Sequence, residues 1–187
     1  MGFVADVVEF LRSVVDGAQT PEIKADRGGG DAVTAYHFAP PGDDSQPLPG
    51  DVAYLGEDQG AGNVQSLGYQ DPSTEPKAGP GEKRIYARSG PGEVACEVWL
   101  KGDGTVRLAN DQGSVELAPD GGVTAASGQG TMQLGADGAA SISNGQGSID
   151  LDAAGNVTAT TPLGTFGAAT HTHTTPFGPS GPPMPGT

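Results

Sequence analysis

The sequence is poor in the large hydrophobic side chains that build a globular core. Leu, Ile, Val and Phe together make up 33 of the 187 residues, and aromatic residues account for 5%. Glycine and proline are abundant instead, with 32 and 16 residues, and the formal net charge is -14. Such a composition is typical of a disordered chain, or of a chain that shares its core with others. A large enzyme core is therefore not expected.

Basic residues are also scarce, with 9 Lys and Arg against 23 Asp and Glu. A nucleic-acid binder needs clustered Lys and Arg to replace the counterions of the phosphates, so we expect no nucleic-acid partner. An anionic membrane surface would repel this chain for the same reason. No apolar run reaches the roughly 20 residues of a membrane-spanning helix. Cys96 is the only cysteine, which excludes an intrachain disulfide framework.

Catalytic motifs are missing as well. The sequence holds no Gly-x-Ser-x-Gly, no phosphate-binding loop and no Cys/His pair spaced for covalent catalysis. Acidic pairs such as Asp43-Asp44 lie in turn-like segments without a neighbouring nucleophile or base. We therefore expect no enzyme activity.

From about residue 96 onward, the chain repeats every 17 residues. Period-two alternation of apolar and polar residues predicts half-buried strands, and Asp-Gly pairs supply the positive φ that tight turns need. Each repeat is therefore predicted to form strand, turn, strand, turn. The recurring pairs are Asp103-Gly104, Asp120-Gly121, Asp137-Gly138 and Ala154-Gly155, together with Gln112-Gly113, Gln129-Gly130 and Gln146-Gly147.

A ribbon of such short hairpins has a narrow apolar edge that it cannot bury alone. A single chain could close it by winding into a solenoid, or three identical chains could each supply one side of a triangular prism. The second arrangement explains the low hydrophobic content, because three chains share one core. We therefore predict a homotrimeric, intertwined β-helix or β-prism over residues 91–168, with Cys96 and Trp99 both facing its core.

The chain upstream of the repeats predicts a different structure. Five short strands are expected within residues 21–90, separated by Gly/Pro/Asp-rich turns, and they suggest a small OB-like barrel. Within residues 1–20, apolar residues at helical spacing predict a short N-terminal amphipathic helix. The expected fold class is thus all-β apart from this helix. The five strand segments are EIKAD, AVTAYHFAP, DVAYLGE, NVQSLGYQD and KRIYARS.

Close to the end of the sequence, His171 and His173 are separated by one residue. On an extended strand their imidazoles point to the same face, but two ligands are too few for a tight metal site. Three chains around a threefold axis would offer two staggered triangles of nitrogens, which form an octahedron. That geometry favours ferrous iron, with nickel or cobalt as alternatives, over zinc. The ion would be structural, one per trimer, in an apex of residues 169–187; the alternative is two solvent-exposed histidines.

The order of these parts resembles the central spike protein of contractile phage-tail baseplates, a family often called baseplate assembly protein V. The resemblance covers nearly the whole chain. It implies a homotrimer with an OB-fold head, an intertwined β-helix and an apex in which His171 and His173 bind an iron ion. The segments that carry it are Pro47-Leu48-Pro49-Gly50-Asp51, Leu67-Gly68-Tyr69, Arg84-Ile85-Tyr86-Ala87-Arg88, Val98-Trp99-Leu100-Lys101 and His171-Thr172-His173.

The resemblance also implies a function and a location. The barrel would attach to the baseplate hub under the tail tube, and the narrow end would pierce the host outer envelope when the tail contracts. The protein would then lie at the tip of the virion's tail baseplate. A competing interpretation is a trimeric tail fibre or adhesin that binds a host-surface glycan, because fibres also use Gly-rich β-prisms.

Overall fold

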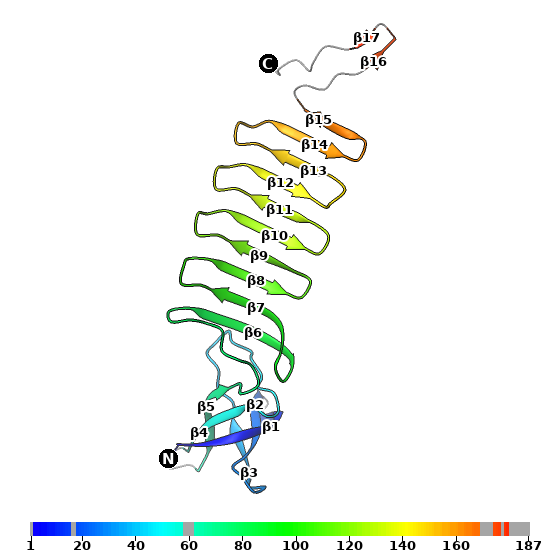
Figure 1. The fold of residues 1–187 in the computed structure, drawn as a ribbon. Coiled ribbons are helices and arrows are strands. Elements are labelled where there is room, and N and C mark those ends of the chain that lie inside the picture. Colours follow the sequence, from blue (N-terminus) through cyan, green and yellow to red (C-terminus); the bar gives the residue numbers. More distant parts are fainter. Residues whose placement is uncertain (1, 16–17, 58–61, 169–173, 177, 180–187) are drawn as a thin grey trace. The chain divides into compact units, whose positions relative to one another are not determined.

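The computed structural model describes residues 2–15, 18–57, 62–168, 174–176 and 178–179. These residues form strands and their connections, and none of them is helical, so none forms a helix that could cross a membrane. The all-β prediction is confirmed. The strands make a closed five-stranded barrel, a ten-stranded sheet and a small hairpin of β16 (Thr174–Thr175) and β17 (Gly178–Pro179) (Figure 1).

The barrel closes in the order β1-β2-β3-β5-β4, because β1 pairs with both β2 and β4. All neighbours are antiparallel except β3 and β5. The interior is narrow: four of its seven buried hydrophobic residues are alanines, and Ile23 and Leu55 are the largest. The five strands are β1 (Gly2–Val15), β2 (Ala18–Asp26), β3 (Ala32–Tyr36), β4 (Val52–Glu57) and β5 (Val64–Gln70).

The amphipathic helix predicted within residues 1–20 is wrong, because Gly2–Val15 form strand β1. Ala5 and Val7 are buried, whereas Val4 and Val8 are exposed, so the segment alternates with period two. A β-bulge after Val7 shifts this alternation and returns Phe10 to the core, which produced the apparent helical spacing. Valines favour the pleated conformation, and the strand pairs with β4 over residues 2–6 and with β2 from residue 6 onward.

The ten-stranded sheet is an antiparallel meander in which each strand pairs with the next along the chain. The predicted succession of short strands and tight turns is present, and Gly121 has the expected positive φ of 90°. Equivalent glycines occupy the same conformation at 104, 138 and 155. The strands are β6 (Lys83–Gly90), β7 (Glu93–Leu100), β8 (Val106–Asn110), β9 (Gly113–Leu117), β10 (Val123–Ser127), β11 (Thr131–Leu134), β12 (Ala140–Ser143), β13 (Ser148–Leu151), β14 (Val157–Thr161) and β15 (Gly164–Gly167).

The strand predicted at KRIYARS is present as β6, but it pairs within the ten-stranded sheet rather than in the barrel. Strand β1 is the fifth strand of the barrel, in place of the KRIYARS segment that the sequence predicted there. The chain divides into two compact units, residues 1–76 with 88–94, and residues 77–87 with 95–187. The tip of the β6–β7 hairpin therefore belongs to the unit that contains the barrel.

Candidate functional site

The predicted metal ligands His171 and His173 lie outside the described residues. Among the residues that the structure does describe, no group of three or more His, Cys, Asp and Glu side chains is placed to hold a metal. The feature that these residues do offer is one face of the ten-stranded sheet.

This face carries two parallel rows of apolar side chains, and we call it the apolar face. Residues directly opposite each other in neighbouring strands project to the same side of a sheet, so the strand register defines both rows. The first row runs through Val98, Leu108, Val115, Ala125, Met132, Ile142, Ile149, Ala159 and Phe166. The second runs through Leu100, Val106, Leu117, Val123, Leu134, Ala140, Leu151 and Val157.

The apolar face is open to solvent in the single chain. Met132 and Ile149 expose 55% and 57% of their surface, and Phe166 exposes 52%. By contrast, the buried hydrophobic residues that form the core cluster all belong to the barrel. An open groove of about 960 Å³ follows this face and is lined by residues from β6 to β12. Contiguous exposed apolar surface of this kind marks an interaction site.

The opposite face of the same sheet is polar. One line of paired residues begins with Glu97 and continues with alanine, serine and threonine alone. The adjacent line begins with Trp99 and continues with charged, hydroxyl and amide side chains. The sheet is thus a single layer with one largely polar and one apolar side, which is half of a two-layer architecture. The adjacent line reads Trp99, Arg107, Glu116, Thr124, Gln133, Ser141, Asp150 and Thr158.

Cys96 and Trp99 were both predicted to face the core of the first repeat, and the structure places them on opposite faces. Cys96 lies in the groove with Val98, two residues further along β7. Trp99 lies on the polar side, where its Nε1 donates to Glu82 at 3.0 Å. Residues three apart on a strand cannot share a face, so the prediction for Trp99 was wrong.

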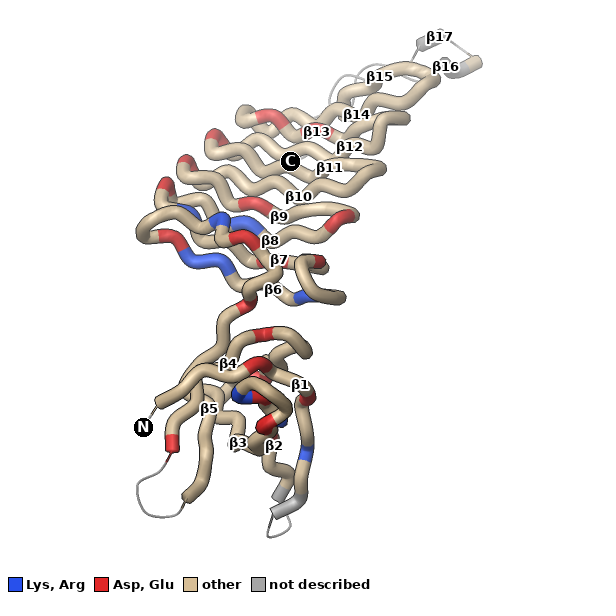
Figure 2. Tube along the Cα trace, turned by 60° about the horizontal axis from the view of Figure 1, so that its bottom comes forward, with Lys and Arg blue, Asp and Glu red and all other residues tan. Residues whose placement is uncertain are grey.

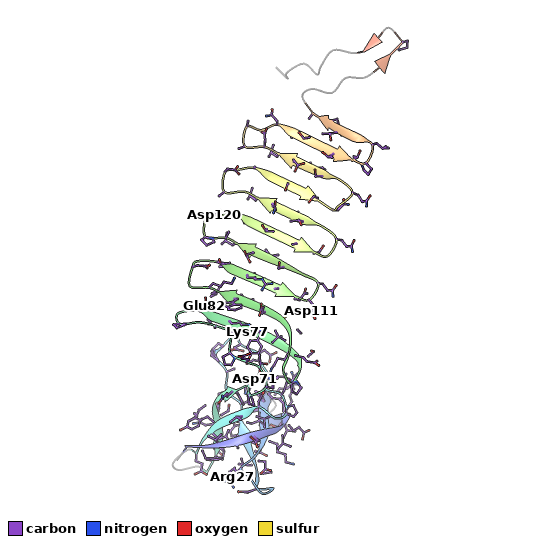
Figure 3. All side chains as sticks on the ribbon, in the orientation of Figure 1. Arg27, Asp71, Lys77, Glu82, Asp111 and Asp120 are labelled. Atoms are coloured by element: carbon purple, nitrogen blue, oxygen red, sulfur yellow. The ribbon has the colours of Figure 1, made fainter. Side chains whose placement is uncertain are left out.

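A polar cluster around Trp99 fastens the first strands of the sheet to the loop before β6. The Arg84 guanidinium donates to Glu97 at 2.6 Å and lies 4.8 Å from the centre of the Tyr86 ring. Glu82, which is labelled in Figure 3, accepts hydrogen bonds from the backbone of Gly79 and Gly102 and from Trp99. These bonds lower the pKa of Glu82, with the backbone bond from Gly79 as the largest cause.

Within the other unit, a buried ion-pair cluster joins the hairpin tip to the barrel's connecting loops. Arg88 donates to both carboxylate oxygens of Asp51, at 2.9 and 2.6 Å, and also lies 2.9 Å from Asp71. Asp51 additionally accepts from the backbone of Leu48 at 2.8 Å. Two of the segments that carry the family resemblance therefore meet here. No local pattern signals this pair, because Asp51 and Arg88 are 37 positions apart.

His37, in the segment that follows strand β3, is 8% exposed. Its Nδ1 lies 2.6 Å from the Tyr69 hydroxyl, and its ring contacts Phe10 edge-on at 5.5 Å. Burial raises the pKa of Tyr69. The imidazole of His37 and the hydroxyl of Tyr69 are thus hydrogen-bonded to each other, and both rings pack within the barrel unit.

Comparison with known proteins gives no family. No family model matches the chain, and no curated protein matches it. Among solved structures, the wild-type TCP10 domain of Danio rerio CPAP is 14% identical in sequence, over 82% of this chain and 95% of that chain. Its TM-score is 0.30, which is too low to indicate a shared fold.

Proposed function

We propose that this protein is the structural subunit of a homotrimeric central spike in a contractile tail baseplate. The spike caps the tail tube and pierces the host outer envelope on contraction. The observation that carries the proposal is the apolar face, which a single chain leaves in water. A needle made of three such chains acts mechanically and needs no enzymatic activity.

Three chains suit the apolar face better than two. Its rows are two residues apart along each strand, so the strip is only about 7 Å wide. Two such strips facing each other would leave their core open along both edges. Three strips facing a common axis close it as a triangular prism, an intertwined β-helix in which the low hydrophobic content of each chain suffices.

The barrel supports the head of such a spike. Its strand order β1-β2-β3-β5-β4, closed between β1 and β4, suits an OB-like barrel of five strands. With its own core of alanines, Ile23 and Leu55, it does not depend on the sheet for burial. In the proposed assembly this head attaches to the baseplate hub and tail tube protein.

We further propose that His171 and His173 from the three chains hold one structural ferrous ion at the apex, with another six-coordinate transition metal as the alternative. The support is the His-x-His spacing just beyond the repeats and the resemblance to the spike family. Ligation needs neutral imidazoles, so the ion is released as pH falls below their pKa. Metal analysis of the purified trimer should find about one-third of an ion per chain. Unchanged metal content in His171→Ala would exclude this site.

The location of the protein in the particle tests the function as a whole. Electron cryomicroscopy of particles that carry a tagged chain should place one trimer on the tail axis at the baseplate tip. Density at peripheral fibres, together with binding on a glycan array, would instead support the tail fibre or adhesin. Absence of the tag from the baseplate tip would contradict the proposal that this protein is the central spike.

A further inference from the structure

Three successive turns on one side of the ten-stranded sheet share a pattern of hydrogen bonds. They join β8 to β9, β10 to β11 and β12 to β13 (Figure 1). In each turn, a side-chain oxygen of the first residue accepts from the backbone N–H groups two and three positions further along. The turns read Asn110-Asp111-Gln112-Gly113, Ser127-Gly128-Gln129-Gly130 and Asn144-Gly145-Gln146-Gly147. Of these three turns, the last alone places a glycine directly after a side-chain amide.

An asparagine that precedes a glycine is open to attack by its own main chain. The backbone nitrogen of the glycine bonds to the side-chain carbon Cγ, and the proton of that nitrogen leaves with the side-chain NH₂ as ammonia. The product is a five-membered succinimide ring. Water then opens the ring at one of its two carbonyls, which gives either aspartate or isoaspartate. Water is therefore the one reactant that the turn does not itself supply.

The backbone nitrogen of Gly145 is accessible for this reaction. Asn144 and Gly145 are both exposed to water. Gly145 has no side chain to obstruct the approach to Cγ, and its positive φ of 74° is one that other residues seldom adopt. Among the described residues, none accepts a hydrogen bond from the Gly145 N–H, and the strand pairing resumes only at Ser143 and Ser148. The nucleophile is thus not held by the sheet.

The side-chain oxygen of Asn144 is held by two fixed donors. Its Oδ1 accepts from the backbone of Gln146 at 3.0 Å and from that of Gly147 at 3.1 Å. When a nitrogen attacks Cγ, negative charge develops on this oxygen. Backbone N–H groups that are already aimed at the oxygen stabilise that charge in the manner of an oxyanion hole. Hydrogen bonds to a charged acceptor are stronger than those to a neutral one, so the turn favours the transition state over the intact amide.

Asn110 provides a comparison within the same chain. Its Oδ1 accepts from the same two positions, at 2.9 and 3.0 Å, so the donors are matched. The next residue is Asp111, whose side chain obstructs the approach to Cγ and whose carboxylate adds negative charge beside the developing anion. The Asp-Gly turns have the glycine but not the amide, because an ionised carboxylate such as that of Asp120 is a poor electrophile. The combination that the reaction needs is therefore met at Asn144.

We propose that Asn144 is a site of spontaneous deamidation through its own backbone, and that the isoaspartate product weakens the pairing of β12 with β13. In isoaspartate the main chain runs through Cγ, so the connection between the paired residues Ser143 and Ser148 is lengthened by one carbon. The side-chain carbonyl that accepted both hydrogen bonds becomes part of that main chain. This inference concerns one chain and does not depend on the proposed spike.

The modification also changes the charge of the sheet. Either product carries a carboxylate where Asn144 was neutral. Figure 2 shows acidic residues along the sheet, whereas the strands from β9 to β15 hold no Lys or Arg. The new charge therefore has no cation in these strands to pair with, and the modified chain should separate from the original on anion exchange.

Ageing of the full-length protein in ¹⁸O-labelled water at mildly alkaline pH tests the site. Peptide mass spectrometry should find the amide-to-acid mass change at Asn144 with one labelled oxygen, and an isoaspartate fraction within it. The reaction at Asn144 should be at least about tenfold faster than at Asn110. Equal rates at the two residues, or an unmodified Asn144, would overturn the proposal.

Two variants separate the chemistry from the fold of the turn. Gly145→Ala places a side chain beside Cγ and should slow the reaction by about tenfold or more. Asn144→Ser is the matched control, because it copies the turn in which Ser127 accepts the same two hydrogen bonds, and it has no amide to lose. Aged Asn144→Ser should therefore keep its single species on anion exchange.

Hydrogen exchange measures the effect on the sheet. Backbone amides of β12 and β13 should exchange faster in aged wild type than in fresh wild type, and aged Asn144→Ser should match its fresh sample. Aged wild type that carries isoaspartate but exchanges like fresh protein would overturn the weakening of the pair. Neither result depends on the number of chains in the assembly, so a failure here leaves the proposed spike standing.

Discussion

The barrel and the ten-stranded sheet bury hydrophobic surface in different ways. The barrel closes on itself and removes Ile23 and Leu55 from water completely. The sheet has more apolar positions than the barrel core but arranges them in two rows on one face, where Leu134 remains 50% exposed. Closure of the sheet, rather than hydrophobic content, therefore decides whether one chain can bury its own apolar residues. The barrel buries its own core, whereas the sheet of a single chain leaves its apolar face exposed to water.

The largest expected effect comes from a charge on the apolar face. Leu134→Asp places a carboxylate in the second row, where it would be buried on association without a partner, so we expect the oligomer to be lost. Gln133→Asp is the matched control, because it is the neighbouring residue and projects to the polar face. Sedimentation velocity distinguishes the two variants. If both variants associated to the same extent, the apolar face would not be the surface through which the chains associate.

Removal of the buried arginine should be the next largest effect, and it should fall on the barrel unit alone. Arg88→Ala leaves Asp51 and Asp71 buried without their cation, which costs about 3–5 kcal/mol in the free energy of unfolding. Arg27→Ala is the control, since its pair with Asp31 is exposed and contributes less than about 1 kcal/mol. Urea titration followed by circular dichroism measures both. If Arg88→Ala lowered the free energy of unfolding by less than Arg27→Ala does, the buried ion-pair cluster would not stabilise the barrel unit.

A cavity in the barrel core tests whether that core belongs to a single chain. Leu55→Ala removes the larger part of a fully buried side chain and should cost about 2–5 kcal/mol. The transition should not shift with protein concentration, because the barrel core belongs to one chain. Val4→Ala, on the exposed face of β1, should change stability by less than about 0.5 kcal/mol. A midpoint for Leu55→Ala that depends on concentration would indicate that the barrel core is shared as well.

The smallest effect is the acid response of the cluster around Glu82. Its folded-state pKa lies below the usual value of 4.5, so it stabilises the fold above that pH, and the contribution is lost as pH falls through the folded pKa. Trp99, the only tryptophan, donates to this carboxylate and reports its protonation by fluorescence. The emission of wild type should change below about pH 4.5, and Glu82→Gln should remove that change. Persistence of the same change in Glu82→Gln would assign it to another acid.

Local patterns in the sequence predicted the sheet well and the barrel only in part. The strands and Asp-Gly turns of the repeats follow from period-two alternation and positive φ, which depend on near neighbours. Strand β1 was missed because the bulge after Val7 breaks its alternation and imitates helical spacing. Strand β6 was placed in the barrel because its pairing depends on long-range contacts.

The candidate site shows the same division. The alternating segments indicated an apolar side to the ribbon, but only the strand register joins them into two continuous rows, one from Val98 to Phe166 and one from Leu100 to Val157. The contact of Arg88 with Asp51 has no local signal at all. The proposed ligands His171 and His173 lie outside the described residues, and their metal stays a prediction.

One chain exposes the apolar face of its own sheet, so we expect copies of the chain to cover it together. Sedimentation equilibrium of the wild-type protein over a wide range of concentrations measures the mass of the assembly. We expect a mass of three chains, each of 18.6 kDa, that persists at low concentration. A single-chain mass with the sheet stably folded would show that the apolar face needs no partner.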